Sequence, residues 1–494
     1  MHTATLIYGN QLFARHPALT HQSAHSANPV IMIEAHDLCT AYRYHKHKLV
    51  LVLAAMREYR NWLQKEGYTV YYTELSPDTI FLDTLRQVVS QHGIQRLLVV
   101  SPEDRNAASS LRSFATNHNL HLKEYDSPAF LTPREELRDW FSSYTARNKQ
   151  PRMEQFYRWQ RKRCSLLVTD GRPEGGAWNY DDQNRKPLPK GSSWDSTTSG
   201  IEIPKIAIPE PTAQVHAVTA RVDELVPENP GETSGFWLPV TRAAALSWLT
   251  TFIDERLPCF GTYEDAMAQG EPFLFHSVLS PLLNIGLLTP DEAVDAAIRA
   301  YTSGVAPLNA VEGFVRQILG WREYMRGVYW EKDDLMEANF FGFNRELEDW
   351  WYTTAYTHQK LPIPLHEVLH TVHTYGYCHH IERLMVLGNW FLINEYNPKS
   401  VFRWFQSMFV DAYEWVMVPN VQGMSQYADG GFVATKPYIA GGNYLEKMGH
   451  WWGSAKKAKE SQYTRRYWQF LKNNQDKLAN NHRMKMVLAM ARKR

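Results

Sequence analysis

Short β-rich segments alternate with helix-length amphipathic patterns over residues 1–132, and this alternation constrains the fold more than any other feature of the chain. The β-rich segments are Thr5–Tyr8, Val30–Glu34, Thr69–Tyr72, Arg96–Val100 and His121–Tyr125. The helical patterns between them include Leu49–Glu66, Asp78–His92 and Ala107–Asn117. Strands that alternate with helices of this length form a parallel sheet with helices on its faces. The sequence therefore predicts an α/β domain with a doubly wound parallel sheet over residues 1–132.

The remaining chain divides into an irregular connection and a helical region. Gly, Pro, Asn and Ser recur between Gly171 and Pro211, which is typical of a long ordered loop, and we assign residues 133–239 to an interdomain connection. Apolar stripes at helical spacing then predict a large all-helical domain over residues 240–494. The stripes cover Thr241–Leu257, Phe273–Leu283, Pro290–Thr302, Asn309–Tyr329, Glu346–Thr357, Pro364–Tyr375, Cys378–Ile393, Ser400–Trp415 and Tyr463–Asn474.

Length and composition narrow the class of protein. A chain of 494 residues exceeds the usual size of a single core, in agreement with two domains. No apolar run reaches the roughly 20 residues needed to cross a bilayer, and the N-terminus lacks the pattern of a secretory signal. The four cysteines are far apart, so we expect free thiols. We expect a cytoplasmic monomer without membrane contact.

The carboxyl ends of the predicted strands are the expected ligand edge of the first domain. Gly9, Asn10 and Gln11 follow the first strand, and Glu34 ends the second. No G-x-G-x-x-G or G-x-x-x-x-G-K-[ST] motif occurs at this edge. A dinucleotide or nucleoside triphosphate fingerprint is therefore absent.

A pair of histidines, His379 and His380, begins an apolar helical pattern in the second domain. An imidazole titrates near neutrality, so such a pair can donate or accept a proton at working pH. Two hydrogen-bonded core histidines are the alternative interpretation. A third interpretation rests on His366-Glu367-Val368-Leu369-His370, a formal H-E-x-x-H, which on a helix would present two imidazoles and a glutamate base to a zinc ion.

Basic and aromatic residues are interleaved near the C-terminus. From Ala440 to Arg494 there are 13 Lys and Arg against 3 Asp and Glu, a local +10 in a chain whose net charge is +1. The basic residues include Lys456, Lys457, Arg465 and Arg466, and the rings include Trp451, Trp452, Tyr463, Tyr467 and Trp468. Cations for phosphates and rings for unstacked bases are typical of a nucleic-acid surface, although basic helices are also common solvated faces.

Several sequence blocks carry a joint signal along nearly the whole chain. The blocks are Y-G-N-Q-L-F at Tyr8–Phe13, H-K-H-K-L-V-L-V-L-A-A-M-R at His45–Arg57, M-E-Q-F-Y-R at Met153–Arg158, G-G-A-W-N-Y-D at Gly175–Asp181, N-R-K-P at Asn184–Pro187, F-G-T-Y-E-D-A-M at Phe260–Met267, H-S-V-L-S-P-L-L-N-I-G-L-L at His276–Leu288, E-G-F-V-R-Q-I-L-G-W-R-E-Y at Glu312–Tyr324, G-Y-C-H-H-I-E-R-L-M-V at Gly376–Val386, M-S-Q-Y-A-D-G-G at Met424–Gly431 and A-T-K-P-Y at Ala434–Tyr438. In this order they resemble the photolyase–cryptochrome family, and within it the bacterial (6-4) photolyases that carry an iron–sulfur cluster.

The resemblance implies an antenna domain followed by a helical domain that binds FAD beside a pocket for damaged DNA. By motif position, the implied FAD contacts are His276, Ser277, Leu279, Ser280, Glu312, Arg316, Trp321, Arg322, Asp411 and Asn420. The implied catalytic residues are His379, His380 and Tyr438, which would manage protons on a lesion flipped out of the duplex. Trp404 resembles the proximal aromatic of the family's electron-transfer chain, but Phe405 stands where a second redox ring is expected, which leaves the outer route open.

Two departures from the family pattern alter the expected cofactors. The cluster cysteines would fall near Pro364 and within Gly449–Tyr467, yet the latter interval has no cysteine, so we expect no iron–sulfur cluster; Trp451, Trp452 and Tyr467 would fill its volume. The antenna loop has Asn10 where the family usually has an acid. A 6,7-dimethyl-8-ribityllumazine antenna held by Asn10, Gln11 and Glu34 is therefore left open.

Light-driven repair of UV-damaged DNA, with (6-4) photoproducts as the favoured lesion, explains the histidine pair, Tyr438 and the basic C-terminal region together. A flavin blue-light receptor on the same scaffold, without repair activity, is the alternative. A zinc hydrolase leaves the other blocks unexplained, and we expect no catalytic metal.

Overall fold

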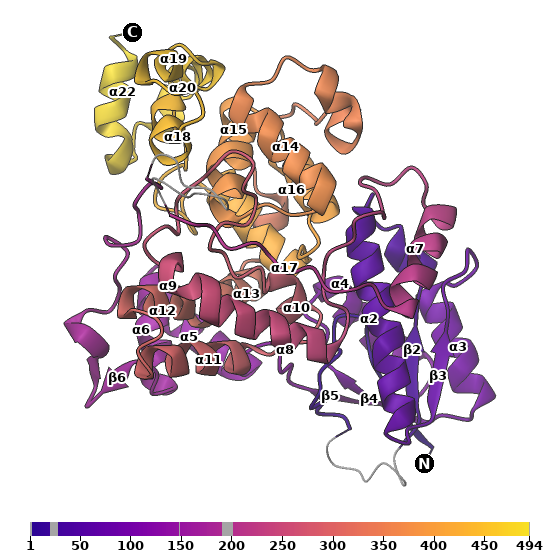
Figure 1. The fold of residues 1–494 in the computed structure, drawn as a ribbon. Coiled ribbons are helices and arrows are strands. Elements are labelled where there is room, and N and C mark those ends of the chain that lie inside the picture. Colours follow the sequence, from indigo (N-terminus) through magenta and orange to yellow (C-terminus); the bar gives the residue numbers. More distant parts are fainter. Residues whose placement is uncertain (1, 20–27, 148, 190–200, 494) are drawn as a thin grey trace.

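The N-terminal domain is a five-stranded parallel sheet in the order β3-β2-β1-β4-β5. The computed structural model describes residues 2–19, 28–147, 149–189 and 201–493. The strands are β1 (Thr3–Leu6), β2 (Val30–Ile33), β3 (Val70–Thr73), β4 (Arg96–Val100) and β5 (His121–Tyr125), and every neighbouring pair is parallel. All five lie within three residues of the predicted segments, and the doubly wound α/β class is confirmed (Figure 1).

Helices cover both faces of the sheet, as the apolar runs of the strands require. Residues of α3 (Phe81–Gln91) and α4 (Arg105–Asn117) share one apolar cluster with the strands. On the other face, α2 (Lys46–Lys65) packs against the strands and against α7 (Ala213–Leu225), which comes from the interdomain connection. The short α1 (His36–Cys39) follows β2. The connection thus returns to the sheet domain before the helical domain begins.

The first part of the connection packs on the helical domain. It contains α5 (Arg134–Thr145), α6 (Met153–Arg163), the two-stranded β6 (Val168–Thr169) and β7 (Arg172–Pro173), and η2 (Glu174–Gly176). The loop after η2 is held by backbone and side-chain hydrogen bonds to the helical domain, among them Lys186 N to Thr262 O (3.1 Å). The later part of the predicted loop, residues 190–200, lies outside the described residues.

The C-terminal domain is almost wholly helical. Its α-helices are α8 (Arg242–Thr251), α9 (Leu257–Phe260), α10 (Ser280–Asn284), α11 (Pro290–Thr302), α12 (Leu308–Val315), α13 (Glu323–Glu331), α14 (Ile363–Tyr375), α15 (Asn389–Ile393), α16 (Pro398–Met408), α17 (Glu414–Met417), α18 (Gly442–Gly449), α19 (Ala455–Lys459), α20 (Gln462–Asn473), α21 (Gln475–Leu478) and α22 (Lys485–Ala491). Short 3₁₀ segments are η5 (Asp333–Glu337), η6 (Asp349–Tyr352), η7 (Thr354–His358) and η10 (His482–Met484).

Four π-helical segments interrupt this domain. They are η3 (Phe252–Arg256), η4 (Arg316–Arg322), η8 (Glu382–Gly388) and η9 (Val418–Ser425). Such segments are uncommon and recur at functional sites. Four predicted site residues, Arg316, Trp321, Arg322 and Asn420, lie on two of them.

Three predicted helices are wrong in part, and one of them, Glu346–Thr357, forms only the short 3₁₀ segments η6 and η7. The segment 273–279 is irregular rather than helical, with Leu274 at φ 45° and Val278 at φ 54°, and the helix begins only at Ser280. The predicted helix 400–415 breaks after Met408, and α17 resumes at Glu414. Both breaks adjoin predicted site residues, namely His276 and Asp411.

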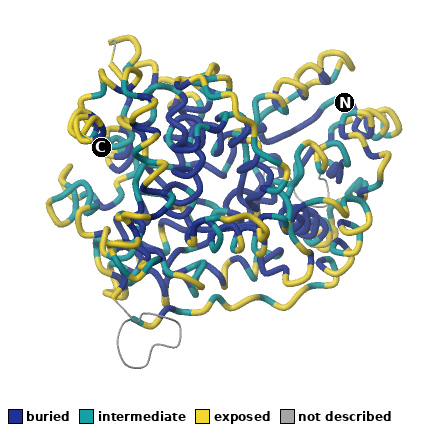
Figure 2. Tube along the Cα trace, turned by 90° about the horizontal axis from the view of Figure 1, so that it is seen from above, coloured by how far each residue is buried: buried dark blue, intermediate teal, exposed yellow. Residues whose placement is uncertain are grey.

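The two domains are joined through buried polar contacts. Glu103 at the end of the sheet domain forms two hydrogen bonds with Arg326 of α13 (2.9 and 2.6 Å). Glu323 of the same helix accepts the backbone N–H groups of Leu131 (2.7 Å) and Thr132 (3.2 Å). One apolar cluster contains buried residues of both domains, such as Leu12 and Leu282, and Figure 2 shows the buried parts of the chain in dark blue. No helix among the described residues is long and apolar enough to cross a membrane.

Candidate active site

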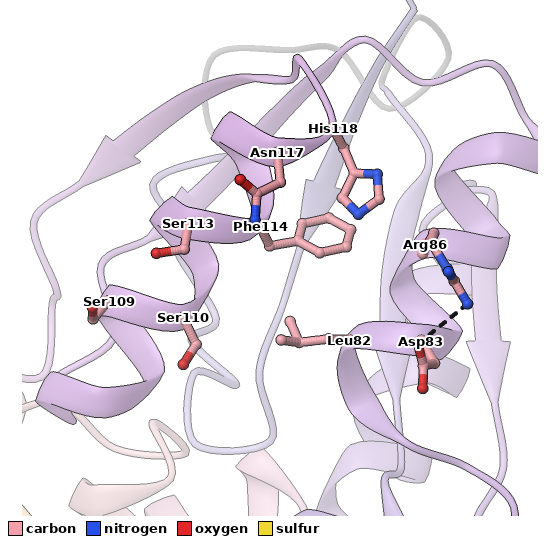
Figure 3. A pocket seen from close by; sticks show the side chains of 9 residues that line it. All are labelled: Leu82, Asp83, Arg86, Ser109, Ser110, Ser113, Phe114, Asn117 and His118. Atoms are coloured by element: carbon pink, nitrogen blue, oxygen red, sulfur yellow. Dashed lines mark ion pairs between the residues drawn. The ribbon is translucent and has the colours of Figure 1, made fainter.

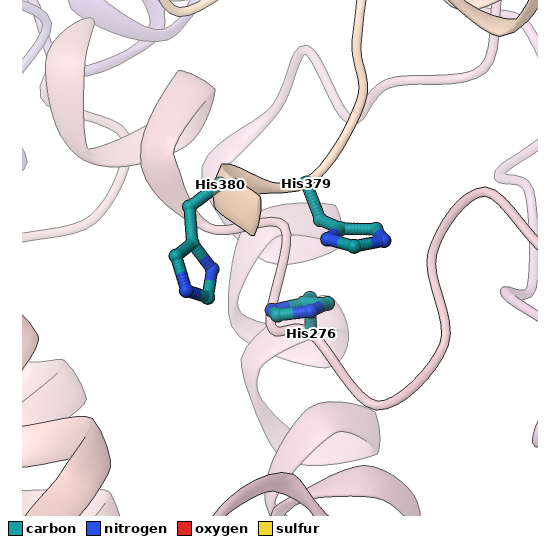
Figure 4. Close-up of side chains that lie close together, drawn as sticks. All are labelled: His276, His379 and His380. Carbon is teal, nitrogen blue, oxygen red and sulfur yellow. The ribbon is translucent and has the colours of Figure 1, made fainter. Parts of the chain in front are cut away.

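Three histidines from two segments meet in the helical domain (Figure 4). His379 and His380 stand just before η8, and His276 comes from the irregular segment before α10. The rings of His276 and His379 are stacked, with centroids 4.5 Å apart, and the ring of His380 lies 5.2 Å from that of His276. His379 is fully buried, whereas the His380 side chain is 49% exposed. The cluster thus reaches from the core to the surface.

The positive φ of Val278 helps to place His276. A β-branched residue rarely adopts φ > 0, and such strain is typical of functional segments. Burial lowers the pKa of His276 well below its usual range, and the charges of His379, His380, Arg256 and Arg383 lower it further. His276 is therefore neutral at working pH.

Acidic residues face the histidine cluster from two sides. Glu382 Oε1 lies 3.4 Å from His379 Nε2, and Asp265 Oδ1 lies 3.8 Å from His380 Nε2. The charge of Asp265 also acts on Tyr438, whose pKa is raised mainly by burial. Tyr438 is 37% exposed. Asp265 therefore faces His380, one of the three predicted catalytic residues, and sequence reasoning had missed it.

A buried ion pair connects two further segments of the site. Arg383 of η8 donates to both carboxylate oxygens of Asp411 (2.9 and 3.1 Å), and Ser280 Oγ donates to the same carboxylate (2.6 Å). Asn284 Nδ2 donates to the backbone oxygen of Asp411 (2.8 Å). Two predicted cofactor residues, Ser280 and Asp411, are thus in direct contact, and Arg383 is a member of the site that sequence reasoning had missed.

Arg256, at the end of η3, is buried and forms no ion pair with a carboxylate of the described residues, although the charge of Glu255 acts on it. Its Nε and Nη1 have no hydrogen-bond partner among the described residues, and burial lowers its pKa to about 10. Its charge acts on His276. A buried guanidinium without an acceptor is costly unless an anion binds to it. Its surroundings therefore fit the diphosphate of FAD.

The interdomain loop is fastened to the predicted cofactor residues Glu312 and Arg316. Glu312 Oε2 accepts the backbone N–H of Tyr180 (2.9 Å), and Arg316 lies between Glu312 Oε1 (3.4 Å) and Asp181 Oδ1 (3.3 Å). Burial raises the pKa of Glu312. The loop residues 180–181 are therefore placed by η4 and α12 before any ligand binds.

The other predicted cofactor residues are already engaged or lie in the core. Trp321 Nε1 donates to Asn420 Oδ1 (3.0 Å). Arg322 donates to Ala129 O and to Asn284 Oδ1 (3.1 Å), and it lies over the rings of Phe130 and Trp415, as a buried structural arginine does. Ser277 Oγ accepts the N–H of Leu279 at 3.4 Å. Leu279 itself is buried.

A row of three indoles leads from the core toward the surface. The ring of Trp404 lies 6.0 Å from that of Trp351, and Trp351 is stacked on Trp350 at 4.3 Å. Trp404 and Trp351 are fully buried, while Trp350 is partly exposed. Phe405, where sequence reasoning had looked for the second ring, lies 5.2 Å from Trp404 and stacks on Phe409 instead.

The predicted antenna residues lie at the carboxyl edge of the sheet. Gln11 Nε2 donates to Val100 O (2.9 Å) and bridges β1 and β4, while its buried Oε1 has no partner among the described residues. Glu34 accepts two hydrogen bonds from Arg57 (2.7 and 2.9 Å), one from Tyr72 OH and one from the N–H of Leu75 (2.8 Å). Asn10 is partly exposed. The acceptor capacity of Glu34 is thus already used within the domain.

The sheet domain also carries an open groove of about 410 Å³ between α3 and α4 (Figure 3). Serines, Asn117 and His118 line one side, and the Asp83–Arg86 ion pair lies on the other. No predicted site residue lines it.

The predicted DNA-binding residues Lys456, Lys457, Arg465 and Arg466 are all exposed, on α19 and α20. Two of the rings predicted to stack on bases are instead core residues. Trp451 is buried, and Tyr463 is buried with its OH donating to Val386 O (3.0 Å). Trp452, Tyr467 and Trp468 remain partly exposed.

The H-E-x-x-H motif lies in the N-terminal half of α14. His366 is half-exposed, and His370 Nδ1 is 3.2 Å from Tyr356 OH. Among the described residues, no third potential ligand joins this pair, whereas His276, His379 and His380 do form such a group. The four cysteines are free thiols, as predicted.

The protein thus combines a parallel-sheet domain with a helical domain that holds the histidine cluster and the Arg383–Asp411 pair. The sequence model described as "Deoxyribodipyrimidine photo-lyase-related protein" matches residues 5–238. A (6-4) photolyase of Agrobacterium fabrum is 36% identical over 98% of this chain and 94% of its own length. The chain therefore belongs to the photolyase–cryptochrome family.

Solved structures agree on the fold. A class III photolyase of Agrobacterium tumefaciens superposes with a TM-score of 0.57 at 16% identity, covering 95% of this chain and 87% of that one. A cryptochrome of Synechocystis superposes with a TM-score of 0.60 at 14% identity, covering 95% and 89%. These likenesses extend over both domains.

Proposed function

We propose that this protein is a light-driven DNA repair enzyme that binds FAD in its helical domain and acts on UV photoproducts, with the (6-4) pyrimidine–pyrimidone lesion as the preferred substrate. The observation that carries this proposal is the histidine cluster, which presents an exposed His380 backed by the buried His379 and His276. The 36% identity to a (6-4) photolyase over nearly the whole chain supports the same assignment.

The residues present fit FAD. The guanidinium of Arg256, whose Nε and Nη1 have no partner among the described residues, supplies the positive charge that a diphosphate requires. Arg256 lies over the ring of Trp248, and Trp248 Nε1 donates to Ser277 O in the Ser277–Ser280 turn. The Arg383–Asp411 pair offers both a donor and an acceptor to a flavin ring. When bound in its reduced form, FAD supplies a light-absorbing electron donor.

The protein's own task in repair is to manage protons. A lesion must leave the duplex before a side chain can reach it, and His380 is the member of the cluster accessible to an extruded base. Asp265 Oδ1 lies 3.8 Å from Nε2 of this ring and can accept its proton, and we assign the Tyr438 hydroxyl as a second polar group for the lesion. His379, fully buried, lies behind His380 with the ring centroids 6.4 Å apart.

DNA contact is proposed for the exposed residues Lys456, Lys457, Arg465 and Arg466, together with the partly exposed rings beside them. Such cations bind phosphates without regard to sequence, so affinity should fall as salt is raised. We propose no iron–sulfur cluster, because the interval Gly449–Tyr467 has no cysteine to hold one.

A lumazine antenna receives limited support. The unpartnered Gln11 Oε1 could accept a hydrogen bond from it, and Asn10 is close in sequence. Glu34 is occupied by Arg57, Tyr72 and Leu75, so it contributes to the shape of the edge rather than a free carboxylate.

The decisive experiment is repair of two defined oligonucleotides, one with a (6-4) photoproduct and one with a cyclobutane dimer, by FAD-loaded, reduced protein with and without blue light. We expect light-dependent loss of the (6-4) lesion only. His380→Ala should lower the repair rate by about 100-fold or more, which is the usual contribution of a general acid. His366→Ala, which changes a half-exposed histidine away from the cluster, is the matched control and should repair at the wild-type rate.

Absence of repair of both lesions, with flavin that is bound and photoreduced normally, would contradict the proposal. It would instead support the alternative, a blue-light receptor, in which the exposed basic residues serve a partner other than damaged DNA.

A further inference from the structure

The proposed proton transfer leaves the ring nitrogens of the buried His379 unexplained. Both ring nitrogens of His379 are buried and have no hydrogen-bond partner among the described residues. Each such group costs about 1–3 kcal/mol unless something binds to it. The nearest acceptor, Glu382 Oε1, is 3.4 Å from Nε2 and makes no well-directed hydrogen bond.

The three rings are close enough to share one ion. Ligand nitrogens from His276, His379 and His380 all lie within 4.8 Å of one another. Zinc–nitrogen bonds of 2.0–2.1 Å place tetrahedral ligands roughly 3.3 Å apart. Small rotations of the rings would close this difference, and His380 is free to make the largest one because half of its side chain is exposed (Figure 4).

We propose that His276, His379 and His380 form a binding site for one transition-metal ion of the Zn²⁺ class, distinct from the H-E-x-x-H motif. Three imidazoles favour Zn²⁺, Ni²⁺ or Cu²⁺ over Mg²⁺ or Ca²⁺, which prefer oxygen ligands. Asp265, 3.8 Å from His380, can supply the fourth ligand. Glu382 can accept the N–H of His379 and so fix its orientation, as carboxylates behind metal-bound histidines do.

The charges around the site favour metal binding when the flavin is present. Two cations, Arg256 and Arg383, act on the cluster. Arg383 is neutralised by Asp411, but Arg256 is unpaired. A bound diphosphate would neutralise Arg256, so the FAD-loaded protein is the form in which a cation meets the least repulsion.

A metal ion at this site would occupy the nitrogens that repair needs. The consequence rests on the proposed function: the ion should act as a reversible inhibitor of repair, because His379 and His380 cannot hold a metal and move a proton through the same nitrogen. Binding itself does not depend on that function.

The test is titration of the FAD-loaded protein with Co²⁺, followed by its visible d–d absorption, and with Zn²⁺, followed by calorimetry. We expect one ion per chain with absorption typical of a tetrahedral nitrogen-rich site. His380→Ala and Glu382→Gln should each weaken binding by about tenfold or more. His380 is exposed, so its replacement should not prevent folding.

The double variant His366→Ala/His370→Ala is the matched control, because it removes the other histidine pair that could hold a metal. It should bind as tightly as the wild type. Unchanged affinity in His380→Ala, or loss of binding in the control, would overturn the proposal. Because both readouts report the metal directly, a protein that binds Zn²⁺ but repairs nothing would refute only the proposed function.

Discussion

Two arginines of the candidate site differ in the partners that the protein itself gives them. Arg383, 17% exposed, is paired with Asp411 through two hydrogen bonds, so the pair stabilises the fold with or without a ligand. Arg256 is more deeply buried, and two of its nitrogens have no partner among the described residues, so it costs free energy until an anion binds. Replacement of Arg383 should therefore lower the free energy of unfolding, whereas replacement of Arg256 should raise that of the flavin-free protein.

Arg256→Gln should weaken FAD binding by about 10- to 100-fold, which corresponds to the loss of charge-assisted hydrogen bonds of about 1.5–3 kcal/mol. The same change should leave the flavin-free protein at least as stable as the wild type, because an uncompensated buried charge is removed. Flavin affinity by fluorescence and thermal unfolding of both forms would measure the two effects.

Arg326→Gln is the comparison for Arg256→Gln. Arg326 is also buried but is bound to Glu103, so its loss leaves a buried carboxylate unpaired and should destabilise the protein with or without flavin. A flavin-free Arg256→Gln protein that is destabilised as much as Arg326→Gln would show that Arg256 is structural.

The sequence could indicate which residues belong to the site better than it could indicate how they are joined. Ser280 and Asp411 were predicted by motif position and do meet, but Arg383 between them stands in an apolar helical pattern where a single arginine carries no distinctive signal. Arg256 and Asp265 were missed for the same reason. Only the structure identifies these residues as members of the site. Arg256 is identified by burial without a hydrogen-bond partner for its Nε and Nη1 among the described residues, and Arg383 and Asp265 by their positions next to other site residues.

At the scale of elements, periodicity predicted the regular segments and failed at the irregular ones. β4, β5 and α11 have exactly the predicted bounds, because their apolar pattern and their flanking turn residues agree. The π-helical segments were not predicted, since one extra residue per turn leaves the local pattern helical. These segments nevertheless carry Arg256, Arg316, Trp321, Arg383 and Asn420, so the elements that set the site are those least visible in the sequence.

The row Trp404, Trp351 and Trp350 joins α16 to η6. We propose that it is the outer electron route that Phe405 cannot supply, because phenylalanine is hard to oxidise. Trp351 Nε1 donates to Glu348 (3.2 Å), which offers an acceptor for the indole proton. We expect Trp351→Phe to slow light-driven reduction of the bound flavin by about tenfold or more, equivalent to about 1.4 kcal/mol in the barrier. Absorption spectroscopy under blue light measures this rate.

Repair by chemically reduced Trp351→Phe protein should be unchanged, since the row serves only reduction. Trp350→Phe, at a partly exposed position, should also slow photoreduction, while Trp62→Phe on α2 should not. Wild-type photoreduction in both Trp351→Phe and Trp350→Phe would rule out this route.

At the scale of the whole molecule, the domains predicted as residues 1–132, 133–239 and 240–494 interlock more than a linear division suggests. α7 from the connection packs on α2, while α6 packs on η4 of the helical domain. Sequence patterns could not show this, because long-range packing leaves no local signal. The division into three segments stays a prediction, and the buried contacts between the domains suggest that they unfold together.

A carboxyl pair at this junction should make the joint stability depend on pH. The charge of Asp104, the residue before α4, acts on Glu414 of α17, and Tyr42 OH and Tyr329 OH each donate a hydrogen bond of 3.3 Å to Glu414. Burial, and then the charge of Asp104, raise the pKa of Glu414 to about 7 from its ordinary value of 4.5. The folded protein therefore holds a proton that the unfolded chain has lost over this range.

Because the folded pKa is the higher one, the stabilisation from this proton is complete below about pH 4.5 and is lost as the pH rises to about 7. We expect the free energy of unfolding of the wild type to fall relative to that of Glu414→Gln across this window, since a glutamine amide does not ionise at any of these pH values. Denaturant unfolding at several pH values measures the difference. Glu135→Gln, at an exposed position of α5, should run parallel to the wild type. A constant difference between wild type and Glu414→Gln from pH 4.5 to 7 would show that the Glu414–Asp104 pair does not couple proton binding to the joining of the domains.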